Sequence, residues 1–210
     1  QELQRRLPES IPAVATVPAI DCALRDGIHL DGPGAVTVGH RLALAMLHLQ
    51  GHPRGLAPIE VKAWHIECDT YFTCVVVEYR NVTGELRSGS RPAGFYVLDD
   101  RGVNHVFRIE LEGSRVRVRL EGNLERVTGL QLRYGYGRDP YCNILDEAGH
   151  ALPVFGPVRL GPQQNWLPFV RRMRVSEPTQ HKGSIRALSC PSLAAAWPVR
   201  EFANDFCPIL

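Results

Sequence analysis

The sequence contains almost no lysine and no large excess of either charge. Lys62 and Lys182 are the only lysines among 24 basic residues, and 22 acidic residues leave a formal net charge of +2. No basic stripe interleaved with aromatic residues is present, which argues against a nucleic-acid-binding protein. No apolar run approaches the roughly 18 residues that a membrane span requires, so we expect none.

The cysteines lack the spacing of a zinc site. Six are present and none forms a Cys-x-x-Cys pair, so we expect neither structural zinc nor another bound cofactor. Cys68 and Cys74 flank a short stretch that suits a hairpin, and Cys190 and Cys207 share the tail, so each pair is a candidate disulfide. Buried free thiols explain the same positions equally well.

The first 52 residues have the pattern of an α/β layer. Residues 11–20, IPAVATVPAI, are a short apolar run bounded by prolines, which predicts a strand buried on both faces, as in a parallel sheet. A single parallel strand followed by one helix has no neighbours to cover it. We therefore expect residues 1–52 to be the C-terminal piece of a larger α/β domain.

A helix is predicted directly after a polar loop, over residues 31–50. Asp31 or Gly32 can cap it, Pro33 suits the first turn, and Gly51 suits its end. Apolar residues at helical spacing predict one apolar face, made of Val38, Leu42, Ala45, Met46 and Leu49.

Residues 53–160 have the texture of an antiparallel β-sandwich. Short segments rich in β-branched and aromatic residues are separated by turn signals at regular spacing. The clearest alternation is in SRVRVRL, where Val116, Val118 and Leu120 point one way and Arg115, Arg117 and Arg119 the other. The pattern fades in residues 161–210, which we interpret as a C-terminal extension, either the start of a further domain or a packing tail. The predicted fold class is mostly β.

The loop before the helix holds an acid and a potential base. Asp26 precedes His29 by three residues, a spacing at which a tight loop lets the carboxylate hold one ring nitrogen while the other faces a substrate. An exposed loop aspartate beside a helix-capping histidine would look the same, so the spacing alone leaves both interpretations open.

The surrounding residues resemble the last catalytic block of the SGNH (GDSL-like) hydrolases. That block has an apolar strand, then Asp-x-x-His-hydrophobic-x-x-x-Gly, then a helix start rich in glycine and arginine. In VPAIDCALRDGIHLDGPGAVTVGHRLALAML, the matching residues are Asp26, Ile28, His29, Gly34, Gly39, Arg41, Leu42 and Ala43.

A second stretch, LQLRYGYGRDPYCNILDEAGHALPVFGP, resembles the end of the sialate O-acetylesterase-like carbohydrate esterases, which belong to this class. The matching positions are Arg133, Tyr134, Pro140, Asn143, Leu145, Gly149, Leu152, Pro153 and Phe155. The likeness covers roughly residues 11–160. It implies the end of a flavodoxin-like α/β domain followed by a β-sandwich.

The resemblance implies a serine esterase that removes O-acetyl groups from carbohydrate. His29 would be the general base, and Asp26 would orient it. The family's nucleophile block, Gly-Asp-Ser-like, should precede residues 11–20, but Ser10 lacks that context. We therefore expect this chain to be inactive by itself. Either an upstream α/β chain, its expected partner, supplies the serine as a processed or separate subunit, or the sequence is a piece of a longer protein.

Two alternatives stay open at this stage. The chain can be a non-catalytic β-sandwich module that binds carbohydrate or mediates subunit assembly, or a degenerate hydrolase that retains binding alone. The sequence does not fix the oligomeric state or the compartment. Because the family is often exported, the resemblance favours a secreted or periplasmic protein.

Overall fold

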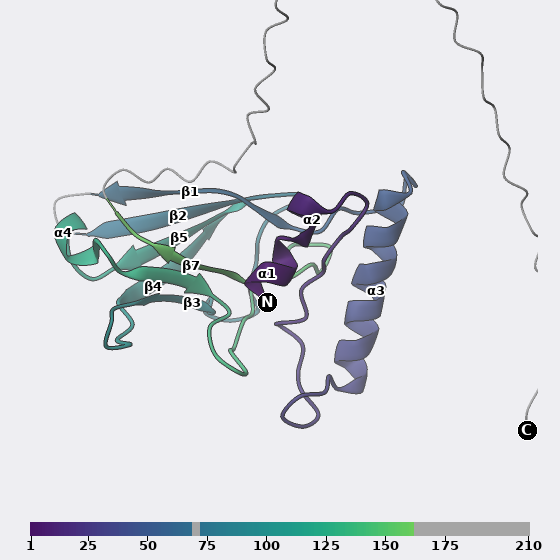
Figure 1. Ribbon diagram of the computed structural model, residues 1–210, viewed down its shortest axis with the longest axis horizontal. Coiled ribbons are helices and arrows are strands. Elements are labelled where there is room, and N and C mark those ends of the chain that lie inside the picture. Colours follow the sequence, from purple (N-terminus) through teal and green to yellow (C-terminus); the bar gives the residue numbers. More distant parts are fainter. Residues whose placement is uncertain (69–71, 162–210) are drawn as a thin grey trace, which may run out of the picture. The chain divides into compact units, whose positions relative to one another are not determined.

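The computed structural model describes residues 1–68 and 72–161. In this part of the chain, Figure 1 shows short N-terminal helices, one long helix and two sheets. The helices are α1 (Glu2–Arg5), α2 (Leu7–Ser10), α3 (Gly32–Leu49) and α4 (Leu124–Val127). The strands are β1 (Glu60–Cys68), β2 (Thr73–Arg80), β3 (Phe95–Leu98), β4 (Val106–Glu112), β5 (Arg115–Leu120), β6 (Gln131–Tyr134) and β7 (Phe155–Arg159).

The strands form two antiparallel sheets, which confirms the mostly-β fold class. One sheet has the order β1-β2-β5-β4 and the other the order β3-β6-β7. Both contribute to one hydrophobic core, in which Trp64, Val75 and Val118 of the first sheet meet Val97 and Leu132 of the second. These side chains are at most 1% exposed, so the core lies between the sheets.

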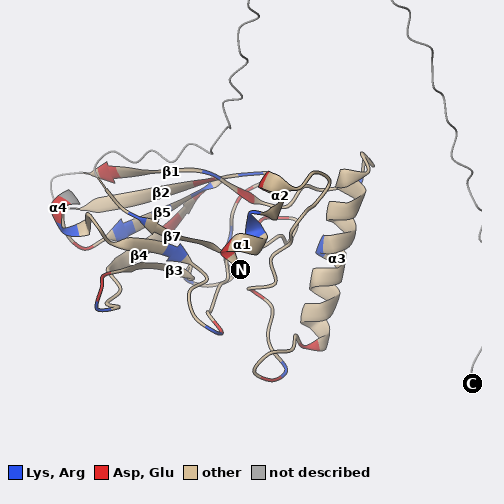
Figure 2. Cartoon of the chain, in the orientation of Figure 1, with Lys and Arg blue, Asp and Glu red and all other residues tan. Residues whose placement is uncertain are grey.

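The alternation predicted for β5 is present. Its apolar side chains, Val116, Val118 and Leu120, are completely buried. Its arginines lie on the opposite face, where they form ion pairs with glutamates of neighbouring strands, for example Arg117 with Glu67 at 2.6 Å. Figure 2 shows these charged positions as blue and red segments on the strands. The outer face is therefore polar and the inner face apolar.

Helix α3 begins and ends as the sequence predicts, but its buried face differs. The Asp31 carboxylate accepts a hydrogen bond from the backbone N–H of Gly34 at 2.7 Å, and Gly51 follows the helix with a φ of 71°. Ala45 is buried, but three other residues of the predicted apolar face are exposed: Leu42 at 50%, Met46 at 56% and Leu49 at 41%. The helix instead buries a face that includes the charged Arg41, 3% exposed, which sequence periodicity of apolar residues does not reveal.

Residues 11–20 form no strand, contrary to the expectation. Residues 14–20 are half-buried and irregular, and Figure 1 shows them drawn out alongside α3. A strand needs a neighbour with which to exchange backbone hydrogen bonds, and none of the described residues supplies one here. The apolar run is therefore present without the sheet that it predicts.

The four cysteines in the described part of the chain are free thiols. Cys68 and Cys74 are not joined, because Cys68 lies opposite Thr73 and Cys74 lies opposite Glu67 in the β1–β2 ladder. Cys190 and Cys207 lie outside the described residues, as does the extension from residue 162 onward. Within the described residues, no helix is long and apolar enough to cross a bilayer.

Candidate active site

The Asp26–His29 loop is closed at its base by backbone hydrogen bonds. Leu24 and Leu30 form an isolated antiparallel bridge, the Arg25 N–H donates to the His29 carbonyl at 2.8 Å, and the Asp31 N–H donates to the Ala23 carbonyl at 3.0 Å. The loop enters α3 directly, as Figure 1 shows. Its base is thus fixed to the helix start, while its tip projects away from it.

The two predicted site residues contact each other at the tip of this loop. His29 Nδ1 lies 2.8 Å from Asp26 Oδ2. The second carboxylate oxygen, Oδ1, accepts the backbone N–H groups of Ile28 at 2.9 Å and of His29 at 2.8 Å. The aspartate therefore shapes the turn with one oxygen and orients the imidazole with the other.

This geometry defines what the imidazole can do chemically. The side chains of His29 and Asp26 are 70% and 53% exposed, and no described residue forms a hydrogen bond with His29 Nε2. The hydrogen bond from His29, followed by those from the two backbone amides, lowers the pKa of the Asp26 carboxyl. An ionised carboxylate on Nδ1 leaves Nε2 as the free base that faces outward.

The position of this loop depends on close packing between Gly34, at the start of α3, and Cys22, which precedes the loop. A side chain at Gly34 would bring its Cβ within 2.8 Å of Asp31 Oδ1 and 3.0 Å of Cys22 Cβ. Only a residue without Cβ permits α3 to begin against Cys22 while Asp31 caps it. Gly34 is therefore part of the reason that Asp26 and His29 lie where they do.

Sequence reasoning missed the group that holds α3 in place. Arg41 forms a bidentate ion pair with Asp21, with both N–O distances 2.7 Å, and Nη1 also donates to the Pro18 carbonyl at 2.9 Å. From the same guanidinium, Nε and Nη2 donate to the Gly149 carbonyl of the sandwich at 3.1 and 2.7 Å. Burial by itself would lower the pKa of Arg41, but the hydrogen bond and charge of Asp21 outweigh it and raise the pKa.

Arg41 thus joins three parts of the chain: the helix, the segment before the Asp26–His29 loop, and the sandwich. Arg133, which matches a position of the second family motif, does not share this docking role. It stacks on Tyr136, with its guanidinium carbon 4.7 Å from the ring centre, and donates to Gln131. Among the described residues it has no carboxylate partner.

A second aspartate–histidine pair lies inside the sandwich and was also missed. Asp146 is fully buried and His150 is 4% exposed. Their side chains are 3.4 Å apart, but the carboxylate oxygens accept the backbone N–H groups of Thr83 and His150 at 3.0 and 2.8 Å. This pair fixes a turn and has no open face for a substrate.

No hydroxyl group of the described residues forms a hydrogen bond with His29. Ser88 donates to the Ser90 carbonyl, and Ser90 contacts Tyr141 and Asn143 on the sandwich. The described residues also contain no group of three or more side chains that could hold a metal ion. The described residues therefore bring an imidazole and a carboxylate together, and none of their hydroxyl groups forms a hydrogen bond with that imidazole.

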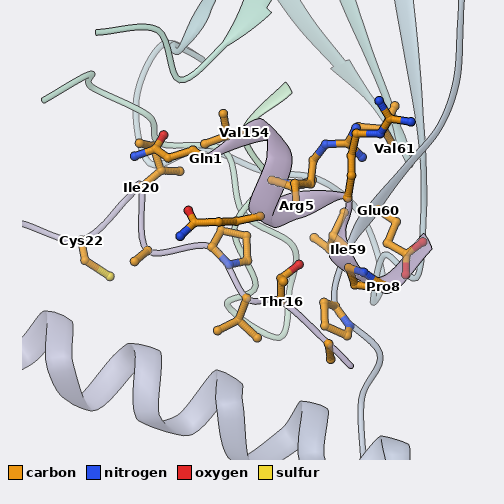
Figure 3. A pocket seen from close by; sticks show the side chains of 18 of the residues that line it. Gln1, Arg5, Pro8, Thr16, Ile20, Cys22, Ile59, Glu60, Val61 and Val154 are labelled. Atoms are coloured by element: carbon orange, nitrogen blue, oxygen red, sulfur yellow. The ribbon is translucent and has the colours of Figure 1, made fainter. Parts of the chain in front are cut away.

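A groove runs past this loop along the N-terminal segment. Its volume is about 1100 Å³, and it is lined by residues 14–20, by α1 and α2, by Gly27 and Ile28 of the loop, and by residues 138–140 of the sandwich. Figure 3 shows Thr16, Ile20 and Ile59 among the side chains that line it. We call it the N-terminal groove.

Comparisons with known proteins show a partial likeness to a solved structure. No family model matches the chain, and no curated protein matches it. Among solved structures, the chain is similar to a carbohydrate acetylesterase from Xanthomonas citri, with 22% identity and a TM-score of 0.48. The likeness covers 64% of this chain and 30% of that protein, so the chain spans less than a third of its length.

Proposed function

We propose that this chain is the C-terminal portion of a carbohydrate O-acetylesterase of the SGNH type. His29 is the general base and Asp26 is its positioning residue. An upstream α/β chain carries the serine nucleophile, and an acetylated carbohydrate is the substrate. The observation that carries the proposal is the 2.8 Å contact from Asp26 to His29 Nδ1 on an exposed loop.

The first half of the reaction forms an acyl-enzyme. The serine O–H proton passes to His29 Nε2 as the serine oxygen attacks the acetyl carbonyl carbon. The tetrahedral intermediate then collapses, the bond from the acyl carbon to the sugar oxygen breaks, and that oxygen takes the proton from the His29 imidazolium. The deacetylated sugar leaves, and the acetyl group stays on the serine.

The second half returns the enzyme to its starting state. Water gives a proton to His29 Nε2 and attacks the acyl carbon; the serine oxygen then takes that proton as the acyl–serine bond breaks, and acetic acid leaves and ionises to acetate. In both halves the imidazolium is stabilised by the Asp26 carboxylate, whose lowered pKa keeps it ionised. The chain alone lacks the hydroxyl in its described part, so we expect no turnover without the partner.

A non-catalytic module is the competing function, and one observation favours it: no described hydroxyl reaches His29. A fluorophosphonate probe, which reacts with activated serines, separates the two. We expect labelling of the partner when this chain is mixed with the polypeptide encoded directly upstream of Gln1. The His29→Ala variant should abolish labelling, and His40→Ala, which removes an exposed histidine of α3, should leave it unchanged.

Absence of labelling in a mixture that has formed a complex would rule out the esterase. So would equal labelling with His29→Ala, because the serine would then be activated by a different base. The module that binds carbohydrate or assembles subunits would be the function that remains.

A further inference from the structure

The two sheets of the sandwich differ in how their charges are balanced. In the first sheet, every Lys, Arg, Asp and Glu of β1, β2, β4 and β5 takes part in an ion pair, for example Arg119 with Glu110 at 2.9 Å. In the second sheet, β3, β6 and β7 contain no Asp or Glu, and their two arginines, Arg133 and Arg159, form no ion pair with a described residue. The second sheet therefore carries positive charge that the described part of the chain leaves unneutralised.

The strand register places these arginines on the same face of the second sheet. On β6, Leu132 is fully buried in the core, so its neighbours Gln131 and Arg133 point outward. Tyr96 of β3 lies opposite Arg133, and Arg159 of β7 lies opposite Gln131. Both arginines therefore lie on the outer face of the sheet, on either side of Gln131.

An exposed aromatic ring lies beside this pair of arginines. Tyr136 follows β6 and is 47% exposed. The Arg133 guanidinium carbon lies 4.7 Å from the centre of its ring, and the ring of Tyr96 lies 6.0 Å away at an interplanar angle of 66°. We call this group the arginine–tyrosine patch; its members are Tyr96, Gln131, Arg133, Tyr136 and Arg159.

The guanidinium of Arg133 is only partly satisfied in this patch. Its Nη2 donates to Gln131 Oε1 at 2.8 Å, but its Nε is buried and has no hydrogen-bond partner among the described residues. A guanidinium keeps its positive charge in proteins, and a half-buried charge without a counter-ion is unfavourable. A carboxylate is the group that best fits a guanidinium, because its two oxygens can accept parallel hydrogen bonds. Charge complementarity therefore favours a carboxylate as the occupant of the patch.

Other parts of the same chain are poor occupants on the same ground. Residues 162–210 contain more basic than acidic side chains. A second copy of the chain would bring the same two unpaired arginines if it met this face with its own. In both cases positive charge would approach positive charge. The anion is therefore expected to come from outside the chain.

We propose that the arginine–tyrosine patch binds a carbohydrate whose sugar rings carry carboxylates. The C–H face of a sugar ring stacks on the exposed ring of Tyr136, and the carboxylates accept hydrogen bonds from Arg133 and Arg159. Gln131 has amide groups that can pair with the sugar hydroxyls. The choice of carbohydrate over other anions rests on the proposed function. The patch adds a second surface, which holds an acidic carbohydrate without acting on it.

A matched pair of sugars gives the first test. Trigalacturonate and galactotriose have the same rings in the same α-1,4 linkage, and only the first carries carboxylates in place of hydroxymethyl groups. In NMR titrations of the full chain, we expect trigalacturonate to bind at least about tenfold more tightly, because hydrogen bonds to charged groups are the stronger ones. We also expect its affinity to fall as salt is added. Equal affinities, or no binding of trigalacturonate, overturn the proposal.

Variants of the patch give the second test. We expect Arg133→Gln and Tyr136→Ala each to weaken trigalacturonate binding by about tenfold, and Arg159→Gln, at an exposed position, by several-fold. The Arg108→Ala variant, on the first sheet, removes one positive charge from an ion pair and should change the affinity by less than about twofold. Circular dichroism checks that each variant is folded. Unchanged affinity in folded Tyr136→Ala and Arg159→Gln, or an equal loss in Arg108→Ala, overturns the proposal.

Two further titrations separate the competing occupants. A glutamate pentapeptide that binds as tightly as trigalacturonate overturns the carbohydrate, because the patch then takes an acidic polypeptide. Loss of trigalacturonate binding in the complex with the polypeptide encoded upstream of Gln1 overturns it too, because the patch then serves assembly. Neither sugar carries an ester, so the result is independent of the esterase: binding without fluorophosphonate labelling retains the patch and rejects the esterase, and labelling without binding does the reverse.

Discussion

Asp26 with His29, and Asp146 with His150, are two pairs of the same side chains in opposite surroundings. The first pair is 70% and 53% exposed at its histidine and aspartate, and its side chains meet at 2.8 Å. The second pair is 6% and 0% exposed and its side chains stay 3.4 Å apart. In both, the carboxylate also accepts two backbone N–H groups.

The difference shows that residue type and spacing alone do not determine whether an aspartate–histidine pair is structural or accessible to a substrate. The buried carboxylate stabilises a turn that also receives Arg41 at Gly149, so its pair is structural. The exposed pair fixes only its own loop and leaves Nε2 accessible, which is the arrangement that a general base requires. Accessibility of the second ring nitrogen, more than the presence of an aspartate, separates the two roles.

The largest effect on stability should come from Arg41, which joins the segment before the exposed pair to the turn of the buried pair. We expect Arg41→Ala to lower the free energy of unfolding by about 3–5 kcal/mol, because it leaves Asp21 charged and largely buried. Urea denaturation followed by circular dichroism measures this loss. The Arg108→Ala variant, at an exposed ion pair of β4, serves as a control and should change stability by less than about 1 kcal/mol.

Removal of each aspartate compares the two pairs directly. We expect Asp146→Ala to cost about 1–3 kcal/mol, because it leaves the buried N–H groups of Thr83 and His150 without an acceptor. The Asp26→Ala variant should unfold at nearly the wild-type urea concentration, because water replaces the carboxylate on the exposed loop. Similar shifts in both variants would mean that the exposed loop is structural as well.

The acid stability of the protein should depend on Asp146. Burial would raise the pKa of its carboxyl, but the nearby His150 side chain and the hydrogen bonds from the Thr83 and His150 amides outweigh burial and lower it. Because the folded pKa lies below the unfolded value of about 3.9, this stabilisation is present above about pH 4 and is lost as the pH falls through the folded pKa. We therefore expect Asp146→Asn to lose less stability than the wild type between pH 6 and pH 3, measured by urea midpoints.

The turn before His150 gives the smallest expected change. Gly149 has a φ of 81°, and a Cβ there would meet no atom within 4 Å, so a substitution introduces backbone strain without a clash. We expect Gly149→Ala to destabilise the protein by about 1–2 kcal/mol, and Gly149→Asn by less, because asparagine tolerates the left-handed region. A loss with asparagine as large as that with alanine would indicate another cause.

The sequence predicted the elements whose signals are local. The Asp31 cap, the Gly51 end of α3 and the alternation of β5 depend on neighbouring residues, and each is present in the structure. The strand predicted over residues 11–20 depends on a neighbouring strand, which the described residues do not supply. The apolar composition could not distinguish a strand from an irregular, half-buried segment.

Contacts between distant residues were the part that the sequence could not provide. Arg41 meets Gly149 across 108 positions, and an arginine in a helix looks like a solvated side chain until its carbonyl partners are known. Asp146 and His150 are close in sequence, in LDEAGHAL, but their burial depends on the packing of two sheets. The Asp26–His29 contact was predictable because a three-residue loop limits how far apart the side chains can lie.

The most direct measurement is the rate of acetate release from an acetylated carbohydrate by the complex with the upstream polypeptide, compared between His29→Gln and His150→Gln. We expect kcat to fall by about 10⁴- to 10⁶-fold with His29→Gln, as it does when the base of a serine hydrolase is removed. We expect a change of less than about tenfold with His150→Gln in the folded fraction. A small loss with His29→Gln, or equal losses in both variants, would contradict the assignment of His29 as the catalytic base.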